Sequence, residues 1–169
     1  MRFRNEFLIA VLCGSLATVT VYARQQEAGD EADEGQEQEV VIQRSELPPA
    51  VERTVAAAAA HATVKGFSRE VENGQTFYEA ALIVDGRSRD VLIDAQGHVV
   101  EVEEQVPFDK LPAKVRAALT SRAGTGTIAV VESLKKKGKI VAYEAHVVAD
   151  GKRSAVQVGP NGETLDHEE

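Results

Sequence analysis

The sequence predicts an α+β fold of two repeats, each a helix followed by an antiparallel four-stranded sheet, with both repeats sharing one continuous sheet. Three observations support this fold class: short motifs recur in the same order 64 or 65 positions apart, a proline opens each expected helix, and glycine-containing pairs stand at hairpin spacing. The recurring motifs are Leu47–Val51 and Leu111–Val115, Asn73-Gly74 and Lys137-Gly138, Tyr78–Ala80 and Tyr143–Ala145, Asp85-Gly86 and Asp150-Gly151, and Gly97 and Gly162. Their shared order predicts one unit over residues 47–107 and a second copy over residues 108–169.

The first 23 residues have the pattern of a secretory signal peptide. Arg2 and Arg4 precede an apolar run that ends at Val21, and Ala23 offers a cleavage position. Polar residues dilute the run, which is shorter than the ~20 apolar residues of a membrane span. We therefore expect cleavage after Ala23, export to the periplasm or the medium, and no membrane span in the mature chain. The single cysteine, Cys13, leaves with the signal and excludes a disulfide framework.

Residues 24–46 predict a disordered acidic spacer. This segment contains eight carboxylates and two arginines, with apolar side chains nearly absent before Val40. Such a composition cannot bury enough apolar surface to offset the loss of chain entropy. The whole chain has a formal net charge of −8, which argues against a nucleic-acid partner, because an acidic surface repels phosphate groups.

Each repeat is expected to open with a helix. Pro48 and Pro112 suit the first helical turn, where a missing N–H costs nothing. The apolar positions that follow recur at helical spacing and define one buried face per helix. They are Val51, Val55 and Ala58 in the first copy and Val115, Ala118 and Leu119 in the second.

The strands follow the helix in each copy, separated by turn residues. If Asp85-Gly86 is a two-residue hairpin loop, Tyr78 lies opposite Ile93 and Ala80 opposite Val91. The same arithmetic around Asp150-Gly151 predicts the pairs Tyr143 with Val158 and Ala145 with Val156. We expect each helix to cover this apolar face and the opposite face to meet solvent or a partner. Residues 159–169 are expected to form a frayed fourth strand at the sheet edge.

This pattern resembles the PepSY-like domain family, which is also described as β-lactamase-inhibitor-like. The residues that carry the resemblance are the Leu-Pro-x-x-Val helix starts, the Tyr-Glu-Ala strands, the Asp-Gly turns and the later turn that ends at Gly97. The resemblance covers about residues 45–169 and implies an exported bacterial protein with a tandem pair of units. It also implies a module that inhibits a peptidase or another enzyme, and it carries over no catalytic residue.

The sequence contains no recognisable catalytic, cofactor or metal motif. The glycine-rich stretch Gly124–Ala129 follows an expected helix and opens a strand, the reverse of a dinucleotide-binding fingerprint. No Gly-x-Ser-x-Gly element is present, and the four histidines lack the spacing of metal ligands. We therefore expect no enzyme, no cofactor and no metal ligand.

The function that the sequence favours is binding, through the sheet face that carries no helix. Its partner would be an exported or envelope protein, with a peptidase suggested by the resemblance. The expected contact residues are Phe77, Glu79, Ile83 and Leu92. The alternative is an envelope sensor of a small ligand or a cation, which would use Glu79, Asp90, Glu101, Glu103 and His146.

Overall fold

The computed structural model describes residues 39–72, 74–165, 167 and 169. The predicted signal peptide and residues 24–38 of the predicted spacer lie outside the described residues. Within the described part, Val40–Ile42 form a strand and Arg44–Glu46 a 3-10 turn. Regular structure therefore begins before Leu47, the start that composition predicted, because Ile42 is buried against the first apolar core.

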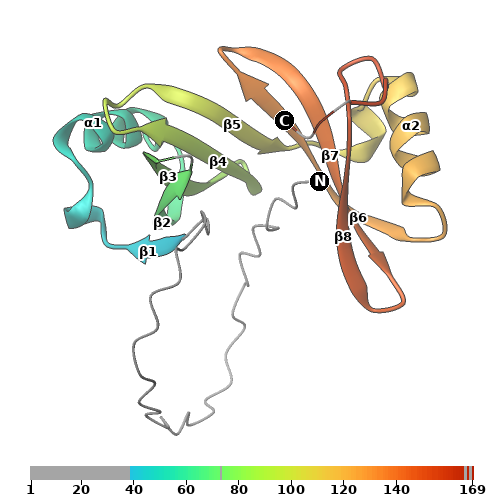
Figure 1. The fold of residues 1–169 in the computed structure, drawn as a ribbon, viewed down its shortest axis with the longest axis horizontal. Coiled ribbons are helices and arrows are strands. Elements are labelled where there is room, and N and C mark those ends of the chain that lie inside the picture. Colours follow the sequence, from blue (N-terminus) through green and yellow to red (C-terminus); the bar gives the residue numbers. More distant parts are fainter. Residues whose placement is uncertain (1–38, 73, 166, 168) are drawn as a thin grey trace, which may run out of the picture. The chain divides into compact units, whose positions relative to one another are not determined.

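Eight strands form a single antiparallel sheet in chain order from β1 to β8 (Figure 1). The strands are β1 (Val40–Ile42), β2 (Thr63–Glu72), β3 (Gln75–Val84), β4 (Arg87–Asp94), β5 (Val99–Gln105), β6 (Thr127–Lys136), β7 (Lys139–Ala149) and β8 (Lys152–Val158). Two α-helices, α1 (Pro49–Ala58) and α2 (Ala113–Ala123), and two 3-10 turns, η1 (Arg44–Glu46) and η2 (Phe108–Lys110), complete the fold.

The expected division into two units of one helix and four strands is wrong. The fold is a single, mostly β sheet in which β1 precedes α1, four strands follow α1, and only three strands follow α2. After β8 the chain turns at Gly159–Gly162 instead of forming a further strand. Pro160 and the positive φ of Gly162 both oppose an extended ladder there.

Both helices have the buried faces that their sequences predict. Val51 and Val55 of α1 are fully buried, as are Val115 and Leu119 of α2. Each helix starts directly after its expected proline, Pro48 or Pro112.

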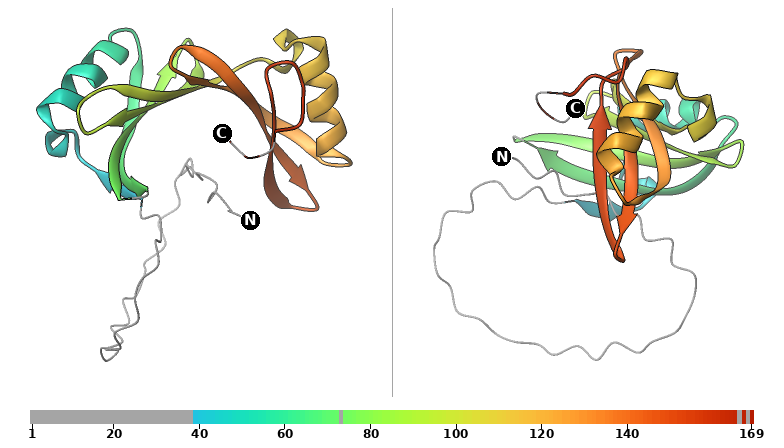
Figure 2. Two further views of the ribbon diagram at one scale, coloured as in Figure 1. Left: turned by 45° about the horizontal axis from the view of Figure 1, so that its top comes forward. Right: turned by 90° about the vertical axis from the view of Figure 1, so that its right-hand side faces the viewer.

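The predicted hairpin registers are confirmed. Tyr78 pairs with Ile93 across β3 and β4, and Tyr143 pairs with Val158 across β7 and β8. Because side chains alternate along a strand, this register assigns every residue of these hairpins to one of two faces. In Figure 2 both helices lie on the same side of the sheet, which we call the helix-covered face. The opposite side is called the helix-free face.

Two separate apolar cores occupy the helix-covered face. The first joins α1 to β1, β3 and β4 and includes Leu82 and Ile93. The second joins α2 to β6, β7 and β8 and includes Val131 and Tyr143. Each helix therefore stabilises its own half of the sheet.

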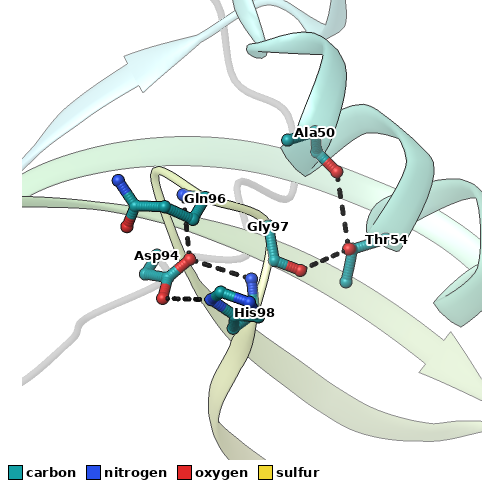
Figure 3. Close-up of polar contacts among 6 residues, drawn as sticks. All are labelled: Ala50, Thr54, Asp94, Gln96, Gly97 and His98. Carbon is teal, nitrogen blue, oxygen red and sulfur yellow. Dashed lines mark hydrogen bonds and ion pairs between the residues drawn. The ribbon is translucent and has the colours of Figure 1, made fainter.

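The turn between β4 and β5 shows how a helix is tied to its strands (Figure 3). The Asp94 carboxylate accepts hydrogen bonds from the backbone N–H groups of Gln96 and His98 at 2.9 and 2.8 Å. Gly97 has a φ of +88°, and a Cβ placed there would lie 2.7 Å from the carbonyl oxygen of Ala50. The Thr54 hydroxyl of α1 donates a 2.6 Å hydrogen bond to the Gly97 carbonyl. Only glycine allows this close approach of turn and helix.

Candidate functional site

The four predicted contact residues all lie on the helix-free face. Phe77, Glu79 and Ile83 alternate along β3, and Leu92 of β4 is the cross-strand partner of Glu79. All four side chains are half-buried. The three apolar members are therefore less exposed than a dominant apolar patch would require.

Carboxylates are the more prominent feature of this face. The register aligns Asp90 with Glu103 across β4 and β5, and Glu132 with Glu144 across β6 and β7. Six carboxylates consequently share the face over five neighbouring strands, and we call this set the acidic band. Its members are Glu79, Asp90, Glu101, Glu103, Glu132 and Glu144.

Crowding and burial perturb the N-terminal part of the acidic band. Burial, reinforced by Asp90 and more distant carboxylates, raises the pKa of Glu79 to about 8. Burial and the charge of Glu132 raise the pKa of Asp90 to about 6. Burial, together with a hydrogen bond and repulsion from Glu101, raises the pKa of Glu103 well above its usual range. Desolvation and like charges both disfavour the ionised carboxylate, so these groups favour a nearby cation.

Positive charge reaches this part of the band through Lys136 of β6. Lys136 Nζ lies 3.3 Å from Glu101 Oε2 and 3.4 Å from Glu169 Oε2. Within the described residues, Glu79, Asp90 and Glu103 form no ion pair with a lysine or arginine. These three carboxyl groups therefore have no cation to stabilise their ionised form, which agrees with their raised pKa values.

The C-terminal part of the acidic band is organised by hydrogen bonds. His146 Nε2 lies 2.9 Å from Glu132 Oε2 and 3.5 Å from Glu144 Oε1. The Ser88 hydroxyl donates to Glu132 Oε1 at 3.0 Å, and the Gln157 amide donates to Glu144 Oε2 at 2.6 Å. Ligand atoms of the two glutamates and the histidine all lie within 4.8 Å of one another. Imidazole and carboxylate groups in this arrangement can hold a cation.

The structure also places the residues of the alternative sensor hypothesis on this face. Glu79, Asp90, Glu101 and Glu103 form the N-terminal part of the acidic band, whereas His146 lies beside Glu132 and Glu144. The sequence analysis did not single out these two glutamates. The Glu-x-His spacing of Glu144 and His146 on one strand was the available signal, because such residues share a face.

The helix-covered face contains a groove with a different character. Its apolar lining includes Ala58 of α1 and Val102 of β5. Its charged lining is net positive, because one carboxylate, Glu104, pairs with both Arg89 and Lys135, and Lys137 adds a third cation. Burial opposes ionisation of Glu104, but hydrogen bonds from Lys135 and Arg89 outweigh it and lower the pKa of this carboxyl. The groove is therefore basic at its edge, whereas the helix-free face is acidic.

No protein-family model and no curated protein matches the chain. Solved structures do match it. Its fold resembles that of a BLIP-like protein. That protein, from Bacteroides fragilis, is 23% identical, with a TM-score of 0.52 over 72% of this chain and 86% of the other. A DUF2874 family protein from Bacteroides ovatus is 19% identical, with a TM-score of 0.54 over 70% and 84% of the two chains.

A third similar structure is a Bacteroides eggerthii protein provisionally assigned to the periplasm. It is 17% identical, with a TM-score of 0.56 over 70% of this chain and 85% of the other. At such identities the likeness shows the fold. It supports a BLIP-like fold, whereas the PepSY-like assignment and the tandem duplication stay predictions. Among the described residues, no helix has the length and apolar character to cross a membrane.

Proposed function

We propose that this protein is an exported, non-enzymatic binding module whose helix-free face holds a basic segment of another exported or envelope protein. The observation that carries the proposal is the N-terminal part of the acidic band. There the half-buried carboxylates of Glu79, Asp90 and Glu103 lie beside the predicted contact residues, and among the described residues they form no ion pair with a lysine or arginine. A lysine or arginine side chain placed among them would gain charge-assisted hydrogen bonds with several carboxylates at once. Phe77, Ile83 and Leu92 would supply apolar contact around this point.

The likeness to a BLIP-like protein supports a role in holding an enzyme. The sequence resemblance indicates the same partner class, a peptidase or another enzyme. The provisional periplasmic assignment of a similar structure agrees with export.

The raised pKa values give such binding a distinctive pH dependence. Glu79, with a pKa of about 8, is mostly protonated at neutral pH. A cationic side chain beside it favours the ionised form, so binding releases a proton from the carboxyl. Affinity should therefore increase as the pH rises from 6 to 9, where a lysine ammonium group with its ordinary pKa of about 10.4 remains charged.

A labelled oligolysine peptide tests the proposal by fluorescence anisotropy against a matched oligoglutamate peptide. We expect binding of the basic peptide only, weaker at high salt and tighter at high pH. The triple variant Glu79→Gln, Asp90→Asn, Glu103→Gln should lose roughly tenfold in affinity, because each removed charge is a point of contact.

The matched control removes three carboxylates elsewhere, at exposed positions of turns and of η2. Its substitutions are Asp85→Asn, Asp109→Asn and Asp150→Asn, and it should bind nearly as well as the parent. Equal losses in both triple variants would show unspecific attraction to an acidic protein and would overturn the proposal. Absence of binding by the parent would overturn it as well.

A further inference from the structure

A second site on the helix-free face involves the histidine that joins β7 to β6. His146 and Glu144 come from β7, and Glu132 comes from β6, directly opposite Glu144 in the register. The ligand atoms of all three lie within 4.8 Å of one another. Glu132 is nine-tenths buried, whereas the other two are half-buried and open to an ion from solvent.

The distances between the imidazole nitrogen and the carboxylate oxygens match the edges of a metal coordination shell. Metal–ligand bonds of about 2.0–2.2 Å place neighbouring ligand atoms about 3.0–3.5 Å apart in octahedral or tetrahedral sites. His146 Nε2 lies 2.9 Å from Glu132 Oε2 and 3.5 Å from Glu144 Oε1. An ion can therefore be accommodated with small movements of the three side chains.

A second, independent feature is the way in which both carboxylates are oriented from outside the cluster. Ser88 of β4 donates to Glu132 Oε1, and Gln157 of β8 donates to Glu144 Oε2. In each glutamate the oxygen without this contact is the one that faces the imidazole. Hydrogen bonds from neighbouring residues that orient ligating carboxylates are typical of protein metal sites.

The surrounding charge also favours a dication. Glu132 and Glu144 both contribute to the raised pKa of Glu103, and Glu132 contributes to that of Asp90. An ion at the cluster would reduce this repulsion across the four strands β4 to β7. One imidazole nitrogen with two carboxylate oxygens suits first-row transition ions better than Ca²⁺, which prefers six to eight oxygen ligands.

We propose that Glu132, Glu144 and His146 bind a divalent first-row transition metal ion, of which Zn²⁺ is the probe. This site uses the C-terminal part of the acidic band, whereas the basic segment proposed above contacts Glu79, Asp90 and Glu103 in the N-terminal part. The competing arrangement has no metal and a protonated imidazole bridging the two glutamates. The two arrangements differ in stoichiometric metal uptake.

Calorimetry of the untagged protein with ZnCl₂ should show one site per chain. His146→Gln and Glu144→Gln should each weaken Zn²⁺ binding by roughly 10- to 100-fold. His98→Gln is the matched control, because His98 Nδ1 lies 2.9 Å from Asp94 Oδ2 and, within the described part of the chain, forms an ion pair with this one carboxylate. It should leave Zn²⁺ affinity within about threefold of the parent value.

A readout that needs no substitution is the imidazole NMR spectrum during the Zn²⁺ titration. The ring signals of His146 should shift at one equivalent, before those of His61, His98 and His167. Absence of stoichiometric binding, equal losses in the His98 and His146 variants, or an unmoved His146 ring would each overturn the proposal. His146→Gln should retain oligolysine binding, so failure of this site is distinguishable from failure of the proposed function.

Discussion

The two halves of the sheet use the same scaffold but organise their helix-free surfaces differently. The N-terminal half comprises β1 to β5 with α1, and the C-terminal half comprises α2 with β6 to β8. The turns that close them make the same backbone bonds: Gly97 N–H to Asp94 C=O and Gly162 N–H to Gly159 C=O, both at 2.9 Å. A Cβ at Gly162 would lie 2.6 Å from the carbonyl oxygen of Lys114, and one at Gly97 would lie 2.7 Å from that of Ala50. In both halves the glycine of the turn thus packs directly against the start of the helix, and we call this contact the joint of that half.

The joints differ in the source of their carboxylate. In the N-terminal half Asp94 accepts from the backbone N–H of Gln96, whereas in the C-terminal half Glu163 accepts from that of Asn161 at 2.8 Å. Glycine stands at position 159, and the Glu163 side chain occupies the space where a Cβ would lie. The same backbone shape is therefore stabilised from opposite ends of the turn.

The helix-free surfaces differ more. The N-terminal half crowds Glu79, Asp90 and Glu103 together and raises the pKa of each. The C-terminal half gives Glu132 and Glu144 hydrogen-bond donors from other strands. The comparison teaches that two halves with similar backbones can differ in the chemistry of their surfaces. The carboxyl groups of the N-terminal half would be stabilised by an added cation, whereas those of the C-terminal half already surround an imidazole.

The largest expected effect tests whether the halves unfold together. Tyr143 is buried in the second core, so Tyr143→Ala should cost about 3 kcal/mol of unfolding free energy, as for other large-to-small core changes. Tyr78, at the matching place in the first half, is only half-buried, and Tyr78→Ala should cost less. Because each half alone is small, we expect one calorimetric transition that moves as a whole. Two transitions, only one of which moves with Tyr143→Ala, would show independent halves.

The next effect tests the equivalence of the joints. Gly97→Ala and Gly162→Ala should each cost roughly 1–3 kcal/mol, because a side chain at these positive φ angles also meets a helix carbonyl. Gly86→Ala is the control, with positive φ but open space around its Cβ, and should cost less. Denaturant melts measure all three. If Gly86→Ala were as destabilising as the other two substitutions, the backbone strain of a positive φ would be the sole cause, and the contact with the helix carbonyl would contribute nothing.

The pH dependence of stability tests the unequal surfaces. The folded pKa of Glu79 is raised, so its contribution to stability is fully present below about pH 4.5 and is lost as the pH rises through about 8. Between pH 5 and 8 the parent should lose on the order of 3 kcal/mol through this group, at about 1.4 kcal/mol per pH unit between the two pKa values. Glu79→Gln should flatten that slope in denaturant melts, whereas the exposed-turn variant Asp85→Asn should keep it. An unchanged slope in Glu79→Gln would contradict the electrostatic account of this half.

The smallest expected effect tests whether the carboxylate of the second turn can be moved to the position that it has in the first turn. Gly159→Asp and Glu163→His would each disturb the second turn, whereas the double variant would reproduce the arrangement at Asp94 and His98. We expect a favourable coupling of roughly 0.5–1 kcal/mol in a double-mutant cycle measured by thermal unfolding. If the two substitutions had strictly additive effects on the free energy of unfolding, the two turns would be alike in backbone shape alone.

Local rules were sufficient to predict the helices and two hairpins but not the strand count. Asp85-Gly86 and Asp150-Gly151 are two-residue loops, so pairings such as Ala80 with Val91 followed by counting. The three residues of β1 follow an acidic segment and are too few to show a period. Residues 159–163 were expected to extend the sheet. They form a turn instead, in which Gly162 packs against the start of α2.

The site at His146 could not be predicted by counting residues from a hairpin loop, for a specific reason. Counting back from the Lys137-Gly138 loop places Glu132 opposite Tyr143, on the helix-covered face. The register shift between Leu134 and Lys135 adds one residue on β7 and moves Glu132 opposite Glu144. Such a bulge reverses every later side chain, and its position depends on packing that the sequence does not display. The acidic residues Glu79 of β3 and Asp90 of β4, where alternation from a known loop applies, were assigned to the correct face.

The junction of the halves has a consequence for how copies of this chain can associate. The cores lie on either side of the β5–β6 ladder, which pairs Glu101 with Lys136 and continues to Gln105 with Glu132. The same ladder formed between β5 of one molecule and β6 of another would leave both cores intact, which is the requirement for three-dimensional domain swapping. A swapped dimer would rebuild each helix-free face from two polypeptides, with Asp90 and Glu103 from one and Glu132 and His146 from the other. In such a dimer each binding face would be complete although its residues come from two chains.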